Sequence, residues 1–159
     1  MYPLSLYIRN TRNLAAFETT TALDPEDVTV LIKGDHDSVR DLYNRYKILT
    51  KKPRFAMKSS EKIVVYPVIE KEFDGGKSLA EKSRNEHQVV KDLLYEIDNM
   101  SQDDPAFNGK LSFCFSEFDH HSTEEEQQHL PHLRKTLTND KRQELGREYN
   151  KTKKFFPTR

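Results

Sequence analysis

The sequence is poor in the features that mark several common classes of protein. Its 159 residues include one cysteine, Cys114, so no disulfide can form within the chain and a reducing compartment is expected. Only five glycines are present and no GxGxxG, GKS or GKT string occurs, which argues against a glycine-rich phosphate-binding loop. No run of 18 apolar residues exists, so no membrane-spanning helix is expected. Strand-like alternation of apolar and polar residues is also absent.

Charged residues are numerous but balanced. The 26 Lys and Arg residues match 26 Asp and Glu residues, which gives a formal net charge of zero. The basic residues are scattered along the chain instead of forming one stripe, so a nucleic-acid partner is not expected. One third of the residues are charged and 35% are hydrophobic. This composition is typical of amphipathic helices around a narrow apolar seam, and the length suits a single domain.

Residues 1–23 differ in composition from the rest of the chain. They contain two arginines, four threonines and a single acid, Glu18. Such an end favours a disordered leader, and an organellar transit peptide is the alternative. We therefore expect a flexible leader at 1–23 and a domain at 24–157. The expected location is cytoplasmic, with a mitochondrial location as the alternative if the leader is a transit peptide.

The spacing of apolar residues predicts five helices. Asp24–Asp27 is typical of a helix start, because it combines acids with a proline in the first turn. Pro67 and Pro131 should kink the second and fourth helices. Short connections favour an all-α, up-down-up-down antiparallel four-helix bundle, with a short, charge-rich fifth helix packing one edge. The predicted helices span residues 24 to about 47–50, 54–72, 77–100, 106–137 and 139–154.

Histidine and glutamate recur at helical spacing in the segment 118–131. His121 and Glu125 are four residues apart, so on a helix they lie on one face, one turn apart. An imidazole beside a carboxylate is ligand chemistry for a transition metal that accepts both nitrogen and oxygen donors. The pair therefore predicts one edge of a metal site.

Spacing alone leaves alternatives to this pair. His120 and Glu124 have the same spacing one position around the helix, and His129 and His132 are spaced to bind a metal at the surface. The acidic run Glu124–Glu126 also fits a solvated face. A lone histidine on an apolar face is more often hydrogen-bonded than bound to metal.

Donors on other predicted helices fall at matching heights. In an antiparallel hairpin, two residues equally far from the turn stand at the same level. The midpoint of Glu61 and His87 falls in the turn after the second helix, and the midpoint of His87 and Glu125 falls beside the turn before the fourth. These three donors should therefore share a layer. The same calculation displaces His36, on the first helix, by a distance on the order of 9 Å.

The candidate donors also lie on the apolar faces of their helices. His87 precedes Val90 by three residues and His121 follows Phe118 by three, so both imidazoles should point inward. A buried ionised acid is costly unless it is paired or bound to a metal. A cation would explain why Glu61 and Glu125 lie on inward faces.

As a set, these motifs resemble the hemerythrin-like, HHE cation-binding family over about residues 26–157. The spacing from Glu61 to Pro67 equals that from Glu125 to Pro131, which is similar to the paired His-x-x-x-Glu motifs of the family. The matching strings are Gly34–Asp37, Glu61–Pro67, Glu86–Lys91, His121–Glu126 with Leu130–Pro131, and the C-terminal Lys153–Arg159.

The resemblance implies a carboxylate-bridged di-iron centre. Two acids would bridge the metal ions and three imidazoles would be terminal ligands, an assignment that favours His121 over its neighbour His120. The implied bridging residues are Glu61 and Glu125, and the implied terminal ligands are His36, His87 and His121.

One position departs from the family pattern. A histidine is expected four residues before Glu61, where this chain has Met57. A thioether suits copper(I) better than iron held by oxygen and nitrogen, so the site should hold one or two iron ions and be partly degenerate. The implied function is sensing or handling of O2, iron or redox state, with a metal ion and O2 as partners and no enzymatic activity. A metal-free bundle serving as a structural or protein-interaction module is the alternative, and a di-iron oxidase is less favoured.

Overall fold

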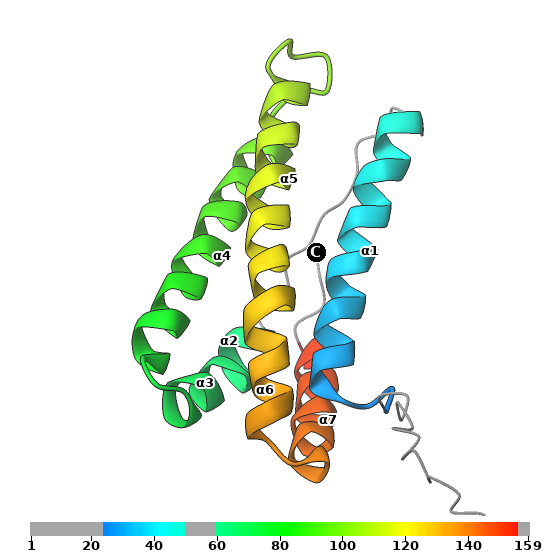
Figure 1. Cartoon of the computed structure of the whole chain (residues 1–159). Coiled ribbons are helices and arrows are strands. Elements are labelled where there is room, and N and C mark those ends of the chain that lie inside the picture. The colour runs from blue at the N-terminus through cyan, green and yellow to red at the C-terminus, as the bar shows by residue number, and fades with distance from the viewer. Residues whose placement is uncertain (1–23, 50–59, 156–159) are drawn as a thin grey trace, which may run out of the picture.

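The computed structural model describes residues 24–49 and 60–155, which form an all-α bundle (Figure 1). Within these ranges there is no strand, and the expected fold class is confirmed. The predicted leader at 1–23, Met57, and residues 54–59 of the predicted second helix lie outside the described residues. The helices are α1 (Val28–Leu49), α2 (Ser60–Val64), α3 (Tyr66–Glu72), α4 (Gly76–Asp98), α5 (Phe107–Glu124), the π-helical turn η1 (Glu125–His129), α6 (Leu130–Thr136) and α7 (Asn139–Phe155).

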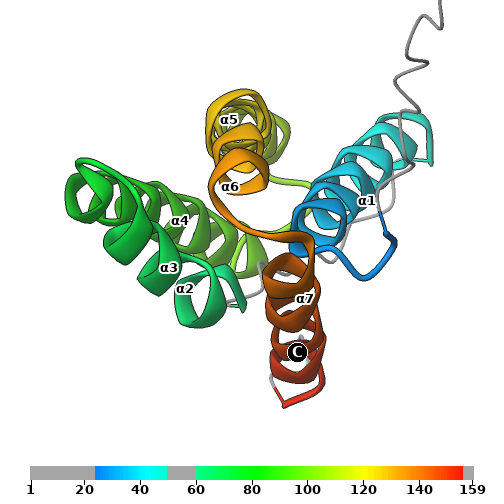
Figure 2. The ribbon, with the colours of Figure 1, turned by 60° about the horizontal axis from the view of Figure 1, so that its bottom comes forward.

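The long helices stand side by side at the corners of the bundle. Seen from one end, α1, α4, the rod formed by α5 and α6, and α7 surround a common interior, with α2 and α3 between α4 and α7 (Figure 2). Helix α4 packs against α3 and α5, while α7 packs against α1 and α2. In the described part of the predicted second helix, the chain forms two short helices, α2 and α3, at one end of the bundle (Figure 1). None of the described helices is long and apolar enough to cross a membrane.

The first helix begins at Val28, a few residues later than the predicted start at Asp24. Asp27 supplies the cap, because its Oδ1 accepts hydrogen bonds from the Thr29 backbone nitrogen at 2.9 Å and the Thr29 hydroxyl at 2.7 Å. Asp24 instead caps the preceding turn through Glu26. Asp27 is fully buried and pairs with Arg142 on α7 at 2.6 Å. Burial alone would raise the pKa of Asp27, but the hydrogen bonds from Arg142 and Thr29 lower it, so the carboxylate stays charged.

Both prolines that were expected to kink helices produce breaks just after a candidate metal-binding acid. The helix that carries Glu61 stops at Val64, and α3 restarts at Tyr66 with Pro67 in its first turn. The helix that carries Glu125 widens into η1 before Pro131 begins α6. Because proline has no backbone N–H and clashes with the preceding turn, each irregularity follows from the sequence. π-Helical turns are often found at functional sites.

Helix α7 has the predicted extent but is more deeply packed than the sequence predicted. It has 17 residues, and its Leu145 and Tyr149 are buried although most of its surface is charged. A Cβ on Gly146 would lie 1.8 Å from the Glu26 carbonyl oxygen, so glycine allows the backbone of α7 to approach the start of α1 closely. The close approach and the Asp27–Arg142 pair fix α7 against α1.

Two apolar clusters fill the interior, and the candidate donors lie between them along the chain. On α1, His36 lies between Ile32 of one cluster and Tyr43 of the other. On α4, His87 lies between Ala80 and Val90 in the same way. The donors thus occupy a polar layer with a packed apolar region on each side.

Candidate metal centre

Four of the five predicted ligands converge in the interior. We call Glu61, His87, His121 and Glu125 the donor group. Each offers one ligand atom, and these atoms all lie within 4.8 Å of one another. Every member is at most 6% exposed. Glu61 comes from α2, His87 from α4, and His121 and Glu125 from the end of α5 and the start of η1.

His36, the fifth predicted ligand, is buried at the edge of the donor group. Its Nε2 lies 3.5 Å from Glu125 Oε2, although His36 does not belong to the set that falls within 4.8 Å. The expected displacement on the order of 9 Å between levels is therefore not seen at this contact. Helix α1 ends at Leu49, before the turn from which the displacement was counted. The structure thus places His36 beside Glu125, at the edge of the donor group.

The pKa values of the two carboxylates in the donor group are shifted in opposite directions, because different neighbours act on each acid. Burial alone would raise the pKa of Glu61, but a hydrogen bond from His87 and the nearby imidazoles lower it. Burial together with the charge of Glu61 raises the pKa of Glu125 well above its ordinary value. Without a cation, these surroundings therefore favour the ionised form of Glu61 and the protonated form of Glu125.

Burial lowers the pKa of His121 to about 4, helped by its neighbour His87. The imidazole is therefore neutral at pH 7, which is the form that binds metals. His121 Nε2 and Glu125 Oε2 are both buried without a hydrogen-bond partner. Such atoms typically cost about 1–3 kcal/mol each. A cation in the donor group would give both atoms a partner, so these residues fit a bound metal.

Two outer acids fix the orientation of two of the imidazoles. Glu126 Oε1 lies 2.9 Å from His36 Nδ1, and Glu86 Oε2 lies 2.7 Å from His121 Nδ1. In both rings the Nε2 atom is left facing Glu125, at 3.5 Å from His36 and 3.4 Å from His121. A carboxylate behind a histidine is the arrangement that usually sets the tautomer of a metal ligand.

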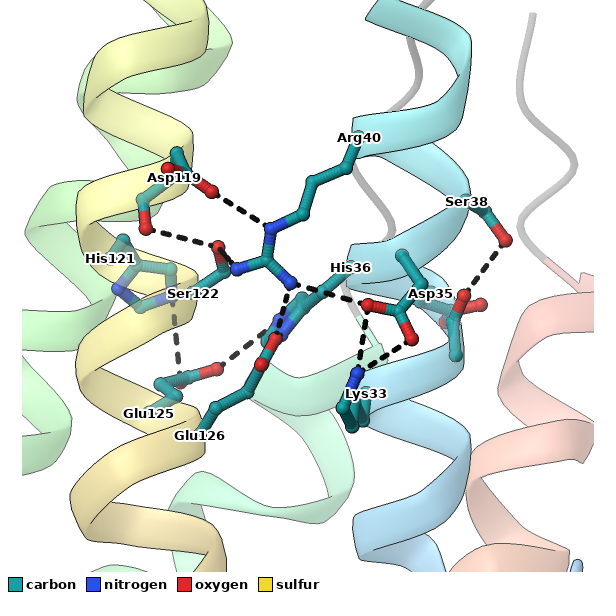
Figure 3. Close-up of polar contacts among 12 residues, drawn as sticks. Lys33, Asp35, His36, Ser38, Arg40, Asp119, His121, Ser122, Glu125 and Glu126 are labelled. Atoms are coloured by element: carbon teal, nitrogen blue, oxygen red, sulfur yellow. Dashed lines mark hydrogen bonds and ion pairs between the residues drawn. The ribbon is translucent and has the colours of Figure 1, made fainter. Parts of the chain in front are cut away.

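Arg40 holds the Glu126 carboxylate in place (Figure 3). Its guanidinium donates to Glu126 at 2.7 Å, to Asp119 at 2.8 Å and to the Ser122 hydroxyl at 2.8 Å. These three hydrogen bonds connect α1 to α5 and η1 directly beside His36. Sequence reasoning did not identify Arg40, because its partners lie about 80 to 90 residues further along the chain.

Two buried tyrosines also contact the donor group and were not predicted as site residues. Tyr66 Oη lies 3.1 Å from His87 Nε2 and donates to Glu125 Oε1 at 3.3 Å. Tyr149 Oη lies 3.0 Å from Glu61 Oε1 and 3.0 Å from Asp35 Oδ2. Both rings are fully buried. In the sequence, Tyr66 was marked only by its position between Glu61 and Pro67. Tyr149 was not marked at all, because the charged composition of its helix predicts a solvent-exposed surface.

The alternatives to the His121–Glu125 pair lie elsewhere. His120 is exposed and forms an outer group with Glu86 and Glu124, where the Lys82 ammonium already binds Glu124 Oε2 at 2.6 Å. His129 is buried and His132 packs its ring against Phe73, so the alternative of a surface metal site at these two histidines is not supported. The structure thus brings His121 and Glu125 into the interior and leaves His120 outside.

The comparisons with known proteins agree with this geometry. A family model for the hemerythrin HHE cation binding domain matches residues 27–133. An uncharacterized hemerythrin-like protein from Schizosaccharomyces pombe is 39% identical over 99 residues, which cover 62% of this chain and 49% of that protein. The chain therefore spans about half the length of this curated relative. No solved structure matches. Helix α7, with Tyr149, lies beyond the range that the family model matches.

Proposed function

The chain belongs to the hemerythrin HHE cation-binding family, and on this premise we propose that it binds non-haem iron in the donor group to sense or handle O2, iron or redox state. One observation carries the proposal: four buried oxygen and nitrogen donors lie within 4.8 Å of one another. Unpartnered His121 Nε2 and Glu125 Oε2 atoms support it. Mixed imidazole and carboxylate donors suit iron better than calcium or magnesium.

The roles follow from the position of each donor. Glu61 and Glu125 would hold the iron through their carboxylate oxygens. His87 and His121 would be terminal ligands, with His36 added through its place beside Glu125. The iron would supply a redox-active, Lewis-acidic centre with an open coordination position. The chain's own contribution is to hold the ligands in a layer from which the apolar clusters exclude water.

We propose a binding or sensing protein and not an enzyme. One cavity of about 410 Å³ lies outside the donor group and is lined by Lys82, Glu86 and Glu117 among others. Another, of about 610 Å³, is lined by Tyr43, Tyr46 and neighbouring residues. Neither of these cavities includes a member of the donor group. An organic substrate placed in either would not touch the proposed ligands.

The proposal is tested by loading the metal-free protein with ferrous iron under anaerobic conditions. We expect one to two iron atoms per chain after desalting, and a higher melting temperature with iron than without it, because a ligand that binds only the folded state stabilises it. Elemental analysis and differential scanning calorimetry measure the two quantities. If the protein retains no iron and its melting is unchanged, the metal-free structural or interaction module is the correct interpretation.

Replacing Arg40 with methionine should weaken iron binding without removing a ligand. The substitution keeps the aliphatic stem but frees Glu126, which then no longer fixes the His36 ring. Loss of such an outer contact typically costs about 10-fold to 100-fold in metal affinity. Competition with a chelator of known affinity measures the change. Arg45→Met is the matched control, since Arg45 lies on the same helix and pairs only with exposed Asp41 among the ion pairs described. Equal affinities in the two variants would contradict the role given to Arg40.

A further inference from the structure

Tyr66 places its hydroxyl among the atoms that would bind the metal. The side chain is fully buried, and its Oη lies 3.1 Å from His87 Nε2 and 3.3 Å from Glu125 Oε1. Tyr66 is the first residue of α3, so the break at Val65 sets the direction of its ring. The hydroxyl therefore reaches the donor group from α3, the helix that follows Glu61 in the chain.

The contact between Tyr66 and His87 cannot persist when His87 binds a metal. His87 Nε2 also faces Glu61 Oε2 at 3.0 Å, so this nitrogen is the atom directed at the donor group. While Nε2 carries a proton it can donate to Glu61 or to the Tyr66 oxygen, and it can bind a cation only after that proton has left. Metal binding at His87 therefore breaks this contact while the Tyr66 oxygen remains in the layer of donors.

Three of the separations, those of Tyr66 from His87 and Glu125 and that of His87 from Glu61, are close to the spacing of adjacent ligands around a six-coordinate ion. Bonds of about 2.1 Å between a metal and nitrogen or oxygen ligands place adjacent donors at right angles about 3 Å apart. The Tyr66 oxygen has that separation from both His87 Nε2 and Glu125 Oε1. The Glu61 and His87 donor atoms are separated by 3.0 Å in the same way. An ion bound to Glu125 and His87 would thus meet the Tyr66 oxygen as a third neighbour.

We propose that Tyr66 is itself an iron ligand through its phenolate oxygen, in a chain whose sequence has Met57 where a histidine ligand is expected. This inference rests on the proposed iron-binding function. On coordination the O–H bond of Tyr66 breaks, its proton leaves to solvent, and an iron–oxygen bond forms, with no change in oxidation state. The resulting donor set would contain oxygen atoms from Tyr66, Glu61 and Glu125 together with the imidazole nitrogens.

Tyr149 provides a matched comparison in the same protein. It is equally buried and contacts the other carboxylate, Glu61, at 3.0 Å. Its second contact is Asp35, which pairs with Lys153 at 2.6 Å, so the Tyr149 hydroxyl bridges two acids and touches no imidazole in the contacts described. Tyr149 therefore orients Glu61 from outside and is not proposed as a ligand.

The test is visible absorption and resonance Raman spectroscopy of the iron(III) form. The protein is loaded with ferrous iron, oxidised with ferricyanide, desalted, and its iron content is measured. We expect a phenolate-to-iron(III) charge-transfer band with tyrosinate ring modes in the wild-type protein and in Tyr149→Phe. Tyr66→Phe should lose the band while it keeps its fold by circular dichroism and at least part of its iron.

Two outcomes separate this inference from the proposed function. Iron bound without a phenolate band, or a band unchanged in Tyr66→Phe, would show that Tyr66 is only a hydrogen-bond donor to Glu125. Failure of the wild-type protein to bind iron would instead overturn the proposed function. If Tyr66→Phe loses all its iron, 3-fluorotyrosine placed at position 66 decides the question, because it shifts the band only when this residue is the ligand.

Discussion

Replacing His121 with alanine should abolish iron binding, with a loss of affinity of more than about 100-fold. Mutation of a residue that only hydrogen-bonds to a metal ligand already lowers metal affinity about 10-fold to 100-fold, and loss of the ligand itself should lower it further. The imidazole is 1% exposed, neutral at pH 7 and oriented by Glu86, and its Nε2 has no hydrogen-bond partner. No other described side chain occupies the same place, so the ligand cannot be replaced from nearby. Iron per chain after anaerobic loading and desalting is the measurement.

His120→Ala is the matched control for this experiment. His120 is the adjacent residue, is exposed, and has the same spacing to Glu124 that His121 has to Glu125. We expect it to retain the iron stoichiometry of the wild-type protein. Circular dichroism of both variants checks that the bundle remains folded. Iron retained by His121→Ala, or lost equally from His120→Ala, would place the metal at the outer group with Glu86 and not at the donor group.

The layer that contains Glu61, His87 and Glu125 could be predicted by counting residues. A short turn between antiparallel helices fixes which residues face one another, so heights follow from sequence distance alone. His36 could not be placed in this way, because the count was made from a turn assigned to Lys51–Pro53, whereas α1 ends at Leu49. An error in the assigned turn is doubled in the calculated difference in height.

Residue counting and hydrophobic periodicity did not predict the site residues Tyr66, Tyr149 and Arg40. Tyr149 lies on a helix with a strongly polar composition, and only the tertiary packing of α7 against α1 and α2 buries it. Arg40 acts through a long side chain that reaches three partners on another helix. Such contacts depend on how far side chains extend between helices, whereas a hydrophobic pattern specifies only which face turns inward. The sequence therefore predicts the inner ligands more readily than the residues that orient them.

Without a metal, the buried donor group should lower the free energy of unfolding of the protein. Two carboxylates and two imidazoles are buried within 4.8 Å of one another, and several of their polar atoms lack partners. Replacing buried ionisable groups with neutral residues of similar volume is often neutral or stabilising when no charge is left unpaired, and Glu125 faces the like charge of Glu61. Binding sites commonly lower the stability of the ligand-free protein in this way, and ligand binding stabilises the folded state again.

Glu125→Gln should therefore stabilise the metal-free protein at neutral pH while it removes iron binding. Glutamine has nearly the same shape and stays neutral, so it avoids the cost of protonating Glu125 in the folded state, and a gain of about 1–3 kcal/mol is expected. The pKa of Glu125 is raised on folding, so above about pH 4.5 the folded wild-type protein binds more protons than the unfolded chain and loses stability as pH rises. The advantage of the variant should be small near pH 4.5 and widen toward pH 7.

Urea unfolding of the metal-free proteins across this pH range measures the difference in free energy of unfolding. Glu124→Gln is the matched control, because Glu124 is the preceding residue, is only partly buried, and pairs with Lys82. A hydrogen bond from Lys82 lowers the pKa of Glu124, so this control should be unchanged or slightly destabilised at pH 7 and should keep its iron. A metal-free Glu125→Gln protein that is less stable than the wild type at pH 7 would mean that Glu125 stabilises the fold in its own right. In that case burial of the acid would no longer argue for a cation.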